Sequence, residues 1–120
     1  MEVSLTDREA DLMRILWERG PSVVSEVRDA LDDELAYTTV LTLLRTMESK
    51  GFVGHEEEGR VHRYYPLIAQ QVAQKSALRH LTNKLFEGSA ELLVTRLVSD
   101  KKLSPEQVRR LRKILDDQSK

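Results

Sequence analysis

The side chains best suited to reading another molecule lie between positions 37 and 50, on one face of an expected helix. Its outward direction holds three hydroxyl residues and one arginine, namely Thr38, Thr42, Arg45 and Ser49. Three positions flank this face: Thr39, Leu41 and Thr46. Short hydroxyl side chains let a helix approach the DNA major groove closely, and arginine can donate two bonds to guanine. We therefore predict DNA contacts here; the alternative is a solvated face, although such faces favour Glu, Lys and Gln over Thr.

Two further helices must hold this one in place. Thr6 and Glu9 have the spacing of a capping box and start a helix whose buried face includes Met13 and Trp17, ending near Gly20. Ser22 is then expected to cap a short second helix, which stops at the acidic residues 32–34. The inner face of the third helix, residues 37–50, is apolar: Val40, Leu43, Leu44 and Met47. The three helices together are predicted to form a helix-turn-helix core.

A β-hairpin should follow, with strands at 52–57 and 60–65 around a turn at Glu58 and Gly59. This register places Glu57 opposite Arg60 and His55 opposite His62. The hairpin would be a wing, and its Arg60, His62 and Arg63 are candidates for contacting DNA phosphates or the minor groove. Because three glutamates precede them, a solvated hairpin is an equally good interpretation.

Residues 67–120 are predicted to form three more helices. The first of these helices has apolar residues along one side: Val72, Leu78, Leu81, Leu85 and Phe86. The second, within residues 90–98, is apolar over most of its circumference. Both apolar surfaces should be buried. The third begins with a capping box at Ser104 and buries Leu111, Ile114 and Leu115. A winged-helix domain of residues 1–66 is too small to cover these faces, so 67–120 is expected to form a homodimer that presents two recognition helices to a palindromic DNA site.

The composition narrows the function further. The chain has no cysteine, which excludes disulfides, thiolate nucleophiles and Cys-ligated metals. No secretory leader or membrane span is recognisable, so we expect a cytoplasmic protein without membrane insertion. Residues 1–68 hold 8 Lys and Arg against 14 Asp and Glu, whereas residues 69–120 hold 11 against 6. The acidic first half disfavours simple electrostatic attraction to DNA, although the placement of a few basic residues matters more than net charge.

Catalytic, metal and cofactor sites are not expected. His55 and His62 could share a metal ion, but two ligands are too few, and no third histidine or carboxylate is obviously fixed beside them. Ser25 and Ser49 have no nucleophile elbow or oxyanion loop around them. We predict a mainly α protein with a small β-hairpin that is not an enzyme.

Several stretches of the chain resemble the BlaI/MecI family of penicillinase and methicillin-resistance repressors, which includes a copper-responsive CopY branch. The resemblance is carried by residues 5–9, 15–17, 36–44, 58–66 and 102–106, in the family's order, and Tyr-Thr-Thr-Val at 37–40 is its most specific part. It implies a homodimeric winged-helix repressor that binds a palindrome, often with TACA/TGTA half-sites. The family's reading positions fall on Thr38, Thr39, Leu41, Thr42 and Thr46, whereas Arg45 follows from helix geometry alone.

The inducing signal is left open by this resemblance. Antibiotic-resistance members are cleaved at an Asn-Phe bond after a sensor protein signals, but the corresponding residues 94–98 here contain no such pair. The cysteine motif of the copper-responsive members is also missing. Cleavage elsewhere, an upstream sensor protein or a small ligand remain alternatives.

Two other functions stay possible at this stage. One is a winged-helix protein-interaction module without specific DNA binding, which the acidic first half favours. The other is a ligand-sensing regulator with a pocket at the dimer interface, which ligand-dependent thermal stabilisation would support.

Overall fold

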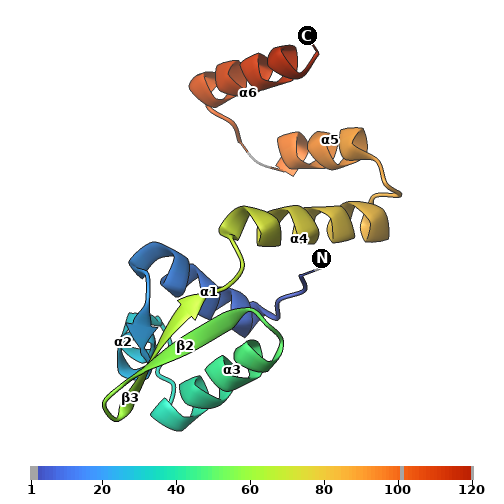
Figure 1. Cartoon of the computed structure of the whole chain (residues 1–120). Coiled ribbons are helices and arrows are strands. Elements are labelled where there is room, and N and C mark those ends of the chain that lie inside the picture. Colours follow the sequence, from blue (N-terminus) through green and yellow to red (C-terminus); the bar gives the residue numbers. More distant parts are fainter. Residues whose placement is uncertain (1–2, 101, 120) are drawn as a thin grey trace. The chain divides into compact units, whose positions relative to one another are not determined.

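A computed structural model describes residues 3–100 and 102–119, in which six helices and a small sheet follow one another along the chain (Figure 1). The first unit begins with α1 (Asp7–Arg19), β1 (Ser22–Val23), α2 (Val24–Ala30) and α3 (Tyr37–Ser49). The hairpin strands are β2 (Val53–Glu58) and β3 (Val61–Pro66), and three helices follow: α4 (Gln70–Leu85), α5 (Ala90–Asp100) and α6 (Pro105–Gln118). The predicted fold class, mainly α with a small β-hairpin, is confirmed.

Helix α1 begins where the local sequence predicts. The amide of Thr6 donates to Oε1 of Glu9 at 2.9 Å, and the amide of Glu9 donates to the Thr6 hydroxyl at 3.2 Å. This capping box satisfies two amides that the first turn leaves without partners. The helix ends at Gly20, whose φ of 83° favours glycine. Its inner residues Leu12 and Leu16 are fully buried in the core.

The predicted cap at Ser22 is wrong. Ser22 lies in β1, where it pairs with Tyr64, and its hydroxyl donates to the carbonyl of Gly20 at 2.9 Å. Helix α2 starts two residues later, at Val24, and its first turn is tied by Oε1 of Glu26, which accepts from the amide of Val23 at 2.9 Å. The sheet therefore has a third strand, in the order β1-β3-β2, because pairing with distant β3 overrides the local capping preference.

Helix α3 matches its predicted length and orientation. Val40, Leu44 and Met47 are completely buried, while Leu43 is only half-buried. Gly51, with a φ of 86°, follows the helix and turns the chain into β2. The opposite side of α3 is consequently left facing outward.

The hairpin has a different register from the predicted one. Glu57 pairs with His62 and Glu58 with Val61, so the turn consists of Gly59 and Arg60. Gly59 adopts a φ of 62° at the first turn position, as in a type II′ turn, instead of the second position that the prediction gave it. Since the register shifts by two residues, each side chain stays on its predicted face.

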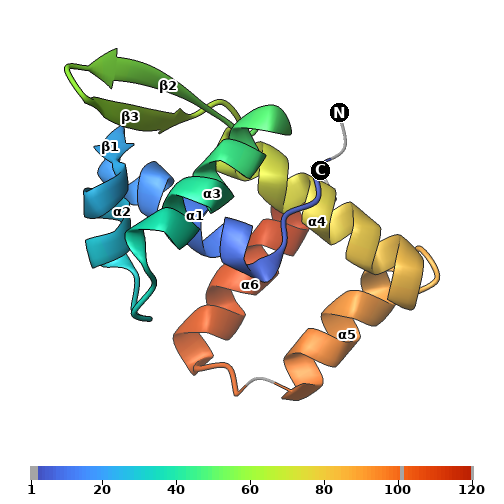
Figure 2. The same cartoon turned by 90° about the horizontal axis from the view of Figure 1, so that it is seen from below.

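The core of the first unit joins the sheet to the helices. Tyr64 of β3 and Val53 of β2 are buried with the inner residues of α1 and α3. The indole Nε1 of Trp17 donates to the carbonyl of Ile68 at 2.9 Å, which fastens the end of the hairpin to α1. These contacts fix β2 and β3 beside α3 (Figure 2).

The chain forms two compact units, one ending at Leu78 and the other beginning at Arg79. The first unit extends past the predicted boundary at residue 66 because the start of α4 belongs to it: Ala73 is buried, and the hydroxyl of Ser76 accepts from the amide of Val3 at 2.8 Å. The assignment of 1–66 to DNA binding and 67–120 to dimerisation stays a prediction.

The second unit leaves the predicted apolar faces uncovered within this single chain. The capping box at Ser104 is present, with Gln107 as its partner. Yet only Leu93 is buried among the described residues of α5 and α6. The large apolar side chains exposed by 40% or more in and just before this unit are Leu78, Leu81, Leu85, Val94, Leu97, Val98, Leu111, Ile114 and Leu115. A single copy of the chain therefore does not bury the apolar faces that were expected to be buried.

Candidate nucleic-acid interface

The outward face of α3 carries six of the predicted contact residues. Thr38, Thr39, Thr42, Arg45, Thr46 and Ser49 are all exposed. Leu41 is half-buried, so it is the least available of the predicted set on this helix. The fully buried row of Val40, Leu44 and Met47 on the other side fixes the helix's rotation about its axis. The core therefore determines which side chains α3 presents.

Two hydroxyls on this face donate within the helix. Thr42 Oγ1 donates to the carbonyl of Thr38 at 2.8 Å, and Ser49 Oγ donates to that of Thr46 at 2.8 Å. With their protons so placed, both oxygens still have lone pairs that could accept from an amino group on a base edge. The methyl group of Thr42 is positioned alongside, where a thymine methyl could pack.

Two hollows border the outward face. One, of about 300 Å³, is lined by Thr38, Thr39, Thr42 and Leu43. The other, of about 140 Å³, lies between α3 and the hairpin, and its lining combines apolar, aromatic and basic side chains: Val24, Tyr37, Leu41, Arg45, Arg60 and His62. The second hollow brings basic side chains of α3 and of the hairpin together, as binding of a backbone phosphate would require.

Sequence reasoning missed part of this second hollow. Tyr37, Leu41 and Arg45 follow one another at intervals of four residues, so they share a stripe along α3. That spacing could have identified Tyr37 as a neighbour of the contact residues. The inclusion of Val24 could not be seen from spacing, because it depends on how α2 packs beside α3, whereas His62 is one of the predicted wing contacts.

Arg45 also interacts with the base of the hairpin. Burial raises the pKa of the Tyr64 hydroxyl above its ordinary value, and the nearby Glu48 carboxylate raises it further. The positive charge of Arg45 opposes both effects, as does its hydrogen bonding to Tyr64. The Arg45 side chain therefore lies close to Tyr64 of β3.

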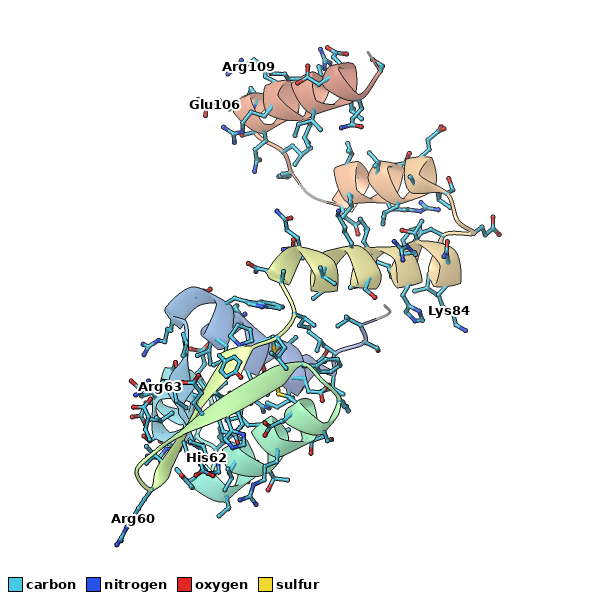
Figure 3. The ribbon with its side chains drawn as sticks, in the orientation of Figure 1. Arg60, His62, Arg63, Lys84, Glu106 and Arg109 are labelled. Carbon is cyan, nitrogen blue, oxygen red and sulfur yellow. The ribbon has the colours of Figure 1, made fainter. Side chains whose placement is uncertain are left out.

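The two hairpin arginines are placed very differently. Arg60 is exposed in the turn, where it lies at the edge of the second hollow, and its side chain extends outward from the tip of the hairpin (Figure 3). Arg63 lies on β3 and is only half-exposed. Of the two, Arg60 has the position expected of a phosphate contact.

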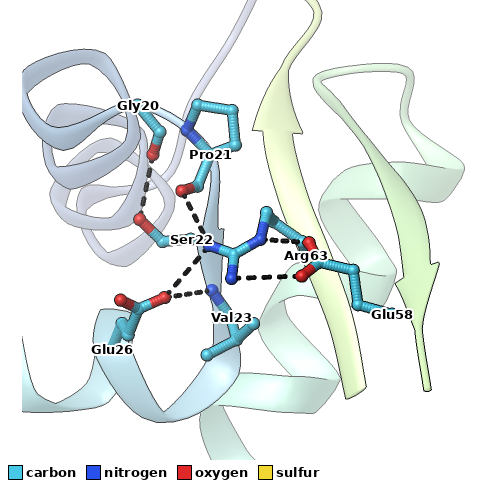
Figure 4. A network of polar contacts seen from close by, with 7 residues as sticks. All are labelled: Gly20, Pro21, Ser22, Val23, Glu26, Glu58 and Arg63. Carbon is cyan, nitrogen blue, oxygen red and sulfur yellow. Dashed lines mark hydrogen bonds and ion pairs between the residues drawn. The ribbon is translucent and has the colours of Figure 1, made fainter. Parts of the chain in front are cut away.

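Arg63 is the centre of a polar network that joins three elements (Figure 4). Its guanidinium donates to both carboxylate oxygens of Glu58, to Glu26 at 3.3 Å and to the carbonyl of Pro21 at 3.3 Å. The hydrogen bond to Glu58 is the main reason that the pKa of Arg63 is raised, and the bond from the amide of Val23 is the main reason that the pKa of Glu26 is lowered. Arg63 therefore holds β3 against β1 and α2.

The hairpin glutamates are partly neutralised by basic neighbours. Glu58 pairs with Arg63, and Oε1 of Glu57 lies 3.7 Å from Nε2 of His62. Glu48 at the end of α3 contacts Nδ1 of His55 through both carboxylate oxygens, at 2.8 and 2.7 Å. Of these contacts, the pair with Arg63 offsets one of the negative charges that the sequence places in the hairpin.

Comparison with known proteins places this arrangement in a family. The family model described as penicillinase repressor matches residues 5–117. The chain belongs to the penicillinase repressor family. This confirms the resemblance seen in the sequence, across nearly the whole chain.

Curated members of the penicillinase repressor family match along most of their length. The methicillin resistance regulatory protein MecI of Staphylococcus aureus strain N315 is 22% identical over 116 residues, covering 93% of each protein. The penicillinase repressor of Bacillus licheniformis is 25% identical over 115 residues, covering 94% of this chain and 90% of that protein. A solved structure of the DNA-binding domain of the repressor BlaI aligns with a TM-score of 0.52 and 28% identity, over 60% of this chain and 93% of that one. These matches support the winged-helix fold of the first unit.

Members of this family are DNA-binding transcriptional repressors and are not enzymes, which confirms both predictions at this level. Within the part of the chain that the structure describes, no helix is both long and apolar enough to cross a bilayer.

Proposed function

We propose that this protein represses transcription as a homodimer that binds a palindromic operator. Helix α3 enters the major groove with Thr38, Thr39, Thr42, Arg45, Thr46 and Ser49 toward the bases, while Arg60 of the wing contacts the phosphate backbone. The observation that carries the proposal is the row of exposed hydroxyl side chains on α3 beside a hollow that Arg45, Arg60 and His62 line. Short polar side chains on an exposed helix suit major-groove reading, because they can bond base edges while the helix lies close to the DNA.

The second unit is proposed as the dimerisation region. On α5, Val94, Leu97 and Val98 have the spacing of one helical face and are each about half exposed, at 45%, 52% and 51%. On α6, Leu111, Ile114 and Leu115 repeat that spacing and are 41%, 56% and 60% exposed. Helices with such faces need an apolar partner, and a second copy of the same chain supplies one.

A dimer also explains why the operator should be a palindrome. A two-fold axis through paired second units relates the two α3 helices, so each reads the same sequence on opposite strands. Because the repressor must meet its operator, its proposed location is the compartment that holds the DNA, the cytoplasm of a bacterial cell.

The acidic first half does not contradict this proposal. In the hairpin, Glu58 is paired with Arg63, and Glu57 lies beside His62. The charges that a phosphate would meet first are those of Arg60 and Arg45, since both are exposed. The placement of these two arginines therefore favours DNA binding even though the net charge of residues 1–68 is negative.

Two substitutions on α3 test the role of this helix. Thr42→Ala and Arg45→Ala should each weaken binding to the operator by about 1–3 kcal/mol, measured by fluorescence anisotropy with labelled duplex. Sedimentation must show that each variant keeps the dimer. Arg14→Ala is the matched control, because Arg14 is an exposed arginine on α1, outside the hollow and outside α3.

The outcome separates DNA binding from the interaction-module alternative. Loss of affinity in the α3 variants but not in Arg14→Ala supports the proposed interface. Equal affinity in all three variants would place DNA contacts elsewhere or show that the protein does not read DNA through α3.

A further inference from the structure

The hairpin carries a cluster of metal-ligating side chains, of which only His62 also lines the hollow of the proposed interface. His55 and Glu57 are two residues apart on β2, so they share a face, and His62 on β3 pairs directly with Glu57. One ligand atom from each of the three residues lies within 4.8 Å of the others. The expectation that no carboxylate stands beside the two histidines is therefore wrong, because the corrected register brings Glu57 to them.

We propose that His55, Glu57 and His62 bind a divalent transition-metal ion of the zinc class. Imidazole and carboxylate groups are ligands that Zn²⁺ accepts, with metal–ligand distances of about 2.0–2.2 Å. Ligand atoms around such an ion lie about 3.3 Å apart, so the widest separation must close by at most about 1.5 Å, whereas Oε1 of Glu57 is already 3.7 Å from Nε2 of His62. The exposed Glu57 side chain can rotate toward the ion. Because the two imidazoles are stacked and their lone pairs lie in the ring planes, the His62 ring must also turn out of the stack before both rings can bind one ion.

The two imidazoles are already adjacent. Their ring centroids are 4.3 Å apart and the ring planes differ by 12°. About a quarter to a third of each histidine side chain is accessible, at 27% for His55 and 33% for His62. An ion can therefore reach the cluster from solvent without opening the core.

Glu48 has the position of a supporting residue for this site. Its carboxylate contacts Nδ1 of His55 at 2.7 and 2.8 Å, which leaves Nε2 as the ring nitrogen that could bind the ion. Metal-binding histidines commonly have their second nitrogen bound to a carboxylate in this manner, which fixes the ring. Because Glu48 belongs to α3, the site would connect the wing to the helix that faces DNA.

Metal binding would also change the charge beside the proposed DNA contacts. His62 lines the hollow that holds Arg45 and Arg60, so the ion would add positive charge next to it. Two imidazoles and one carboxylate leave a coordination position open, which a phosphate oxygen of DNA could occupy. This consequence rests on the proposed function, whereas binding of the ion itself does not.

The first experiment measures Zn²⁺ binding to the full chain without DNA. Isothermal titration with ZnCl₂ in a buffer that does not chelate metal should show one site for each chain. His62→Gln and Glu57→Gln should each weaken this site at least tenfold, and Glu48→Gln should weaken it by about tenfold or more through His55. His80→Gln and Glu56→Gln are the matched controls: His80 is an exposed histidine on α4, and Glu56 is the exposed glutamate between His55 and Glu57.

Thermal unfolding without metal accompanies each titration, because His55 and Glu48 also contribute contacts to the fold. Glu57 and His62 variants that keep the unfolding temperature of the parent protein give the decisive comparison. Zn²⁺ should raise the unfolding temperature of the parent and of both controls, but not that of His62→Gln or Glu57→Gln. No heat of binding to the parent, or equal weakening by His80→Gln, would overturn the proposal.

A second measurement separates the metal site from its effect on DNA. Operator affinity is compared in Zn²⁺ and after dialysis against a chelator, for the parent and for His62→Gln. A tighter complex in Zn²⁺ for the parent alone supports the phosphate contact. If Zn²⁺ binds but operator affinity is unchanged, the metal site stands and its proposed effect on DNA binding is wrong. If the protein binds no DNA under either condition, the proposed function is contradicted and the metal site is not.

Discussion

The Nζ atom of Lys50 lies 2.8 Å from Oε2 of Glu9, and the Glu9 side chain is almost completely buried, with 3% exposed. Lys50 directly follows α3, and Glu9 lies in the first turn of α1. The same carboxylate accepts from the amide of Thr6 through Oε1. One side chain thus completes the cap of α1 and anchors the end of the helix proposed to read DNA.

Replacing Lys50 should weaken this anchor. Lys50→Met removes the charged partner and leaves the Glu9 carboxylate buried beside α1, which should cost about 1–3 kcal/mol of unfolding free energy. The value is measured by urea denaturation at neutral pH. Lys75→Met is the control because Lys75 is exposed on α4, and it should stay within about 0.5 kcal/mol of the parent. A parent-like midpoint for Lys50→Met would show that the pair does not stabilise the fold.

The same pair predicts acid sensitivity. Burial opposes ionisation of Glu9, but hydrogen bonds from Lys50 and Thr6 and the charge of Lys50 together lower its pKa below the ordinary value of 4.5. A carboxyl group whose pKa is lower in the folded state stabilises the protein above its unfolded pKa, and this contribution is lost as pH falls through the folded value.

Unfolding temperatures measured between pH 7 and pH 3 test this linkage. The parent should lose stability below about pH 4.5, and Glu9→Gln should lose less over that interval because it has no proton to gain at this site. Asp7→Asn, at the exposed start of α1, serves as the control. Parallel pH curves for the parent and Glu9→Gln would contradict the assignment.

The hairpin arginines should have separable roles. Arg60→Ala should weaken operator binding, reduce the salt dependence of log K by about one, and leave the unfolding temperature unchanged, since Arg60 is an exposed turn residue. Arg63→Ala should lower the unfolding temperature because it removes the link between Glu58, Glu26 and Pro21. Reversed results, with Arg63→Ala affecting only the salt dependence, would make Arg63 the phosphate contact.

The apolar faces of the second unit predict the oligomeric state. Leu97→Asp and Ile114→Asp each place a charge on a face that is more than half exposed in the single chain, at 52% and 56%. Sedimentation equilibrium should show a dimer for the parent and monomers or a much weaker dimer for these variants. Arg109→Asp, on an exposed position of α6 outside the leucine and isoleucine positions, is the control. A monomeric parent would exclude the homodimer.

Local sequence signals predicted the features that depend on neighbouring residues. The capping boxes at Thr6 and Ser104 and the inner face of α3 follow from spacings of three or four residues. Strand β1 and the Lys50–Glu9 pair did not follow, because each joins segments about forty residues apart. The register of the hairpin was predicted wrongly since either of two turn types could contain Gly59.

In the candidate site, too, local spacing predicted some features, and contacts between distant segments determined the others. The helical period correctly predicted the exposure of Thr38, Thr42, Arg45 and Ser49. It could not distinguish Arg60, free to point outward, from Arg63, whose partners Glu26 and Pro21 lie on other elements. Glu57 was not associated with the two histidines because the predicted register paired it with Arg60.

Operator binding by the parent protein tests the central claim most directly. A labelled duplex with TACA/TGTA half-sites and a scrambled duplex of equal length are titrated over a range of salt concentrations. We expect two protomers on each palindromic duplex, at least a thousandfold preference over the scrambled duplex, and an affinity that falls steeply as salt increases. If the palindrome is not preferred, selection from random DNA seeks a different operator. Equal, weak binding to every duplex, with no sequence recovered by selection, would contradict the account.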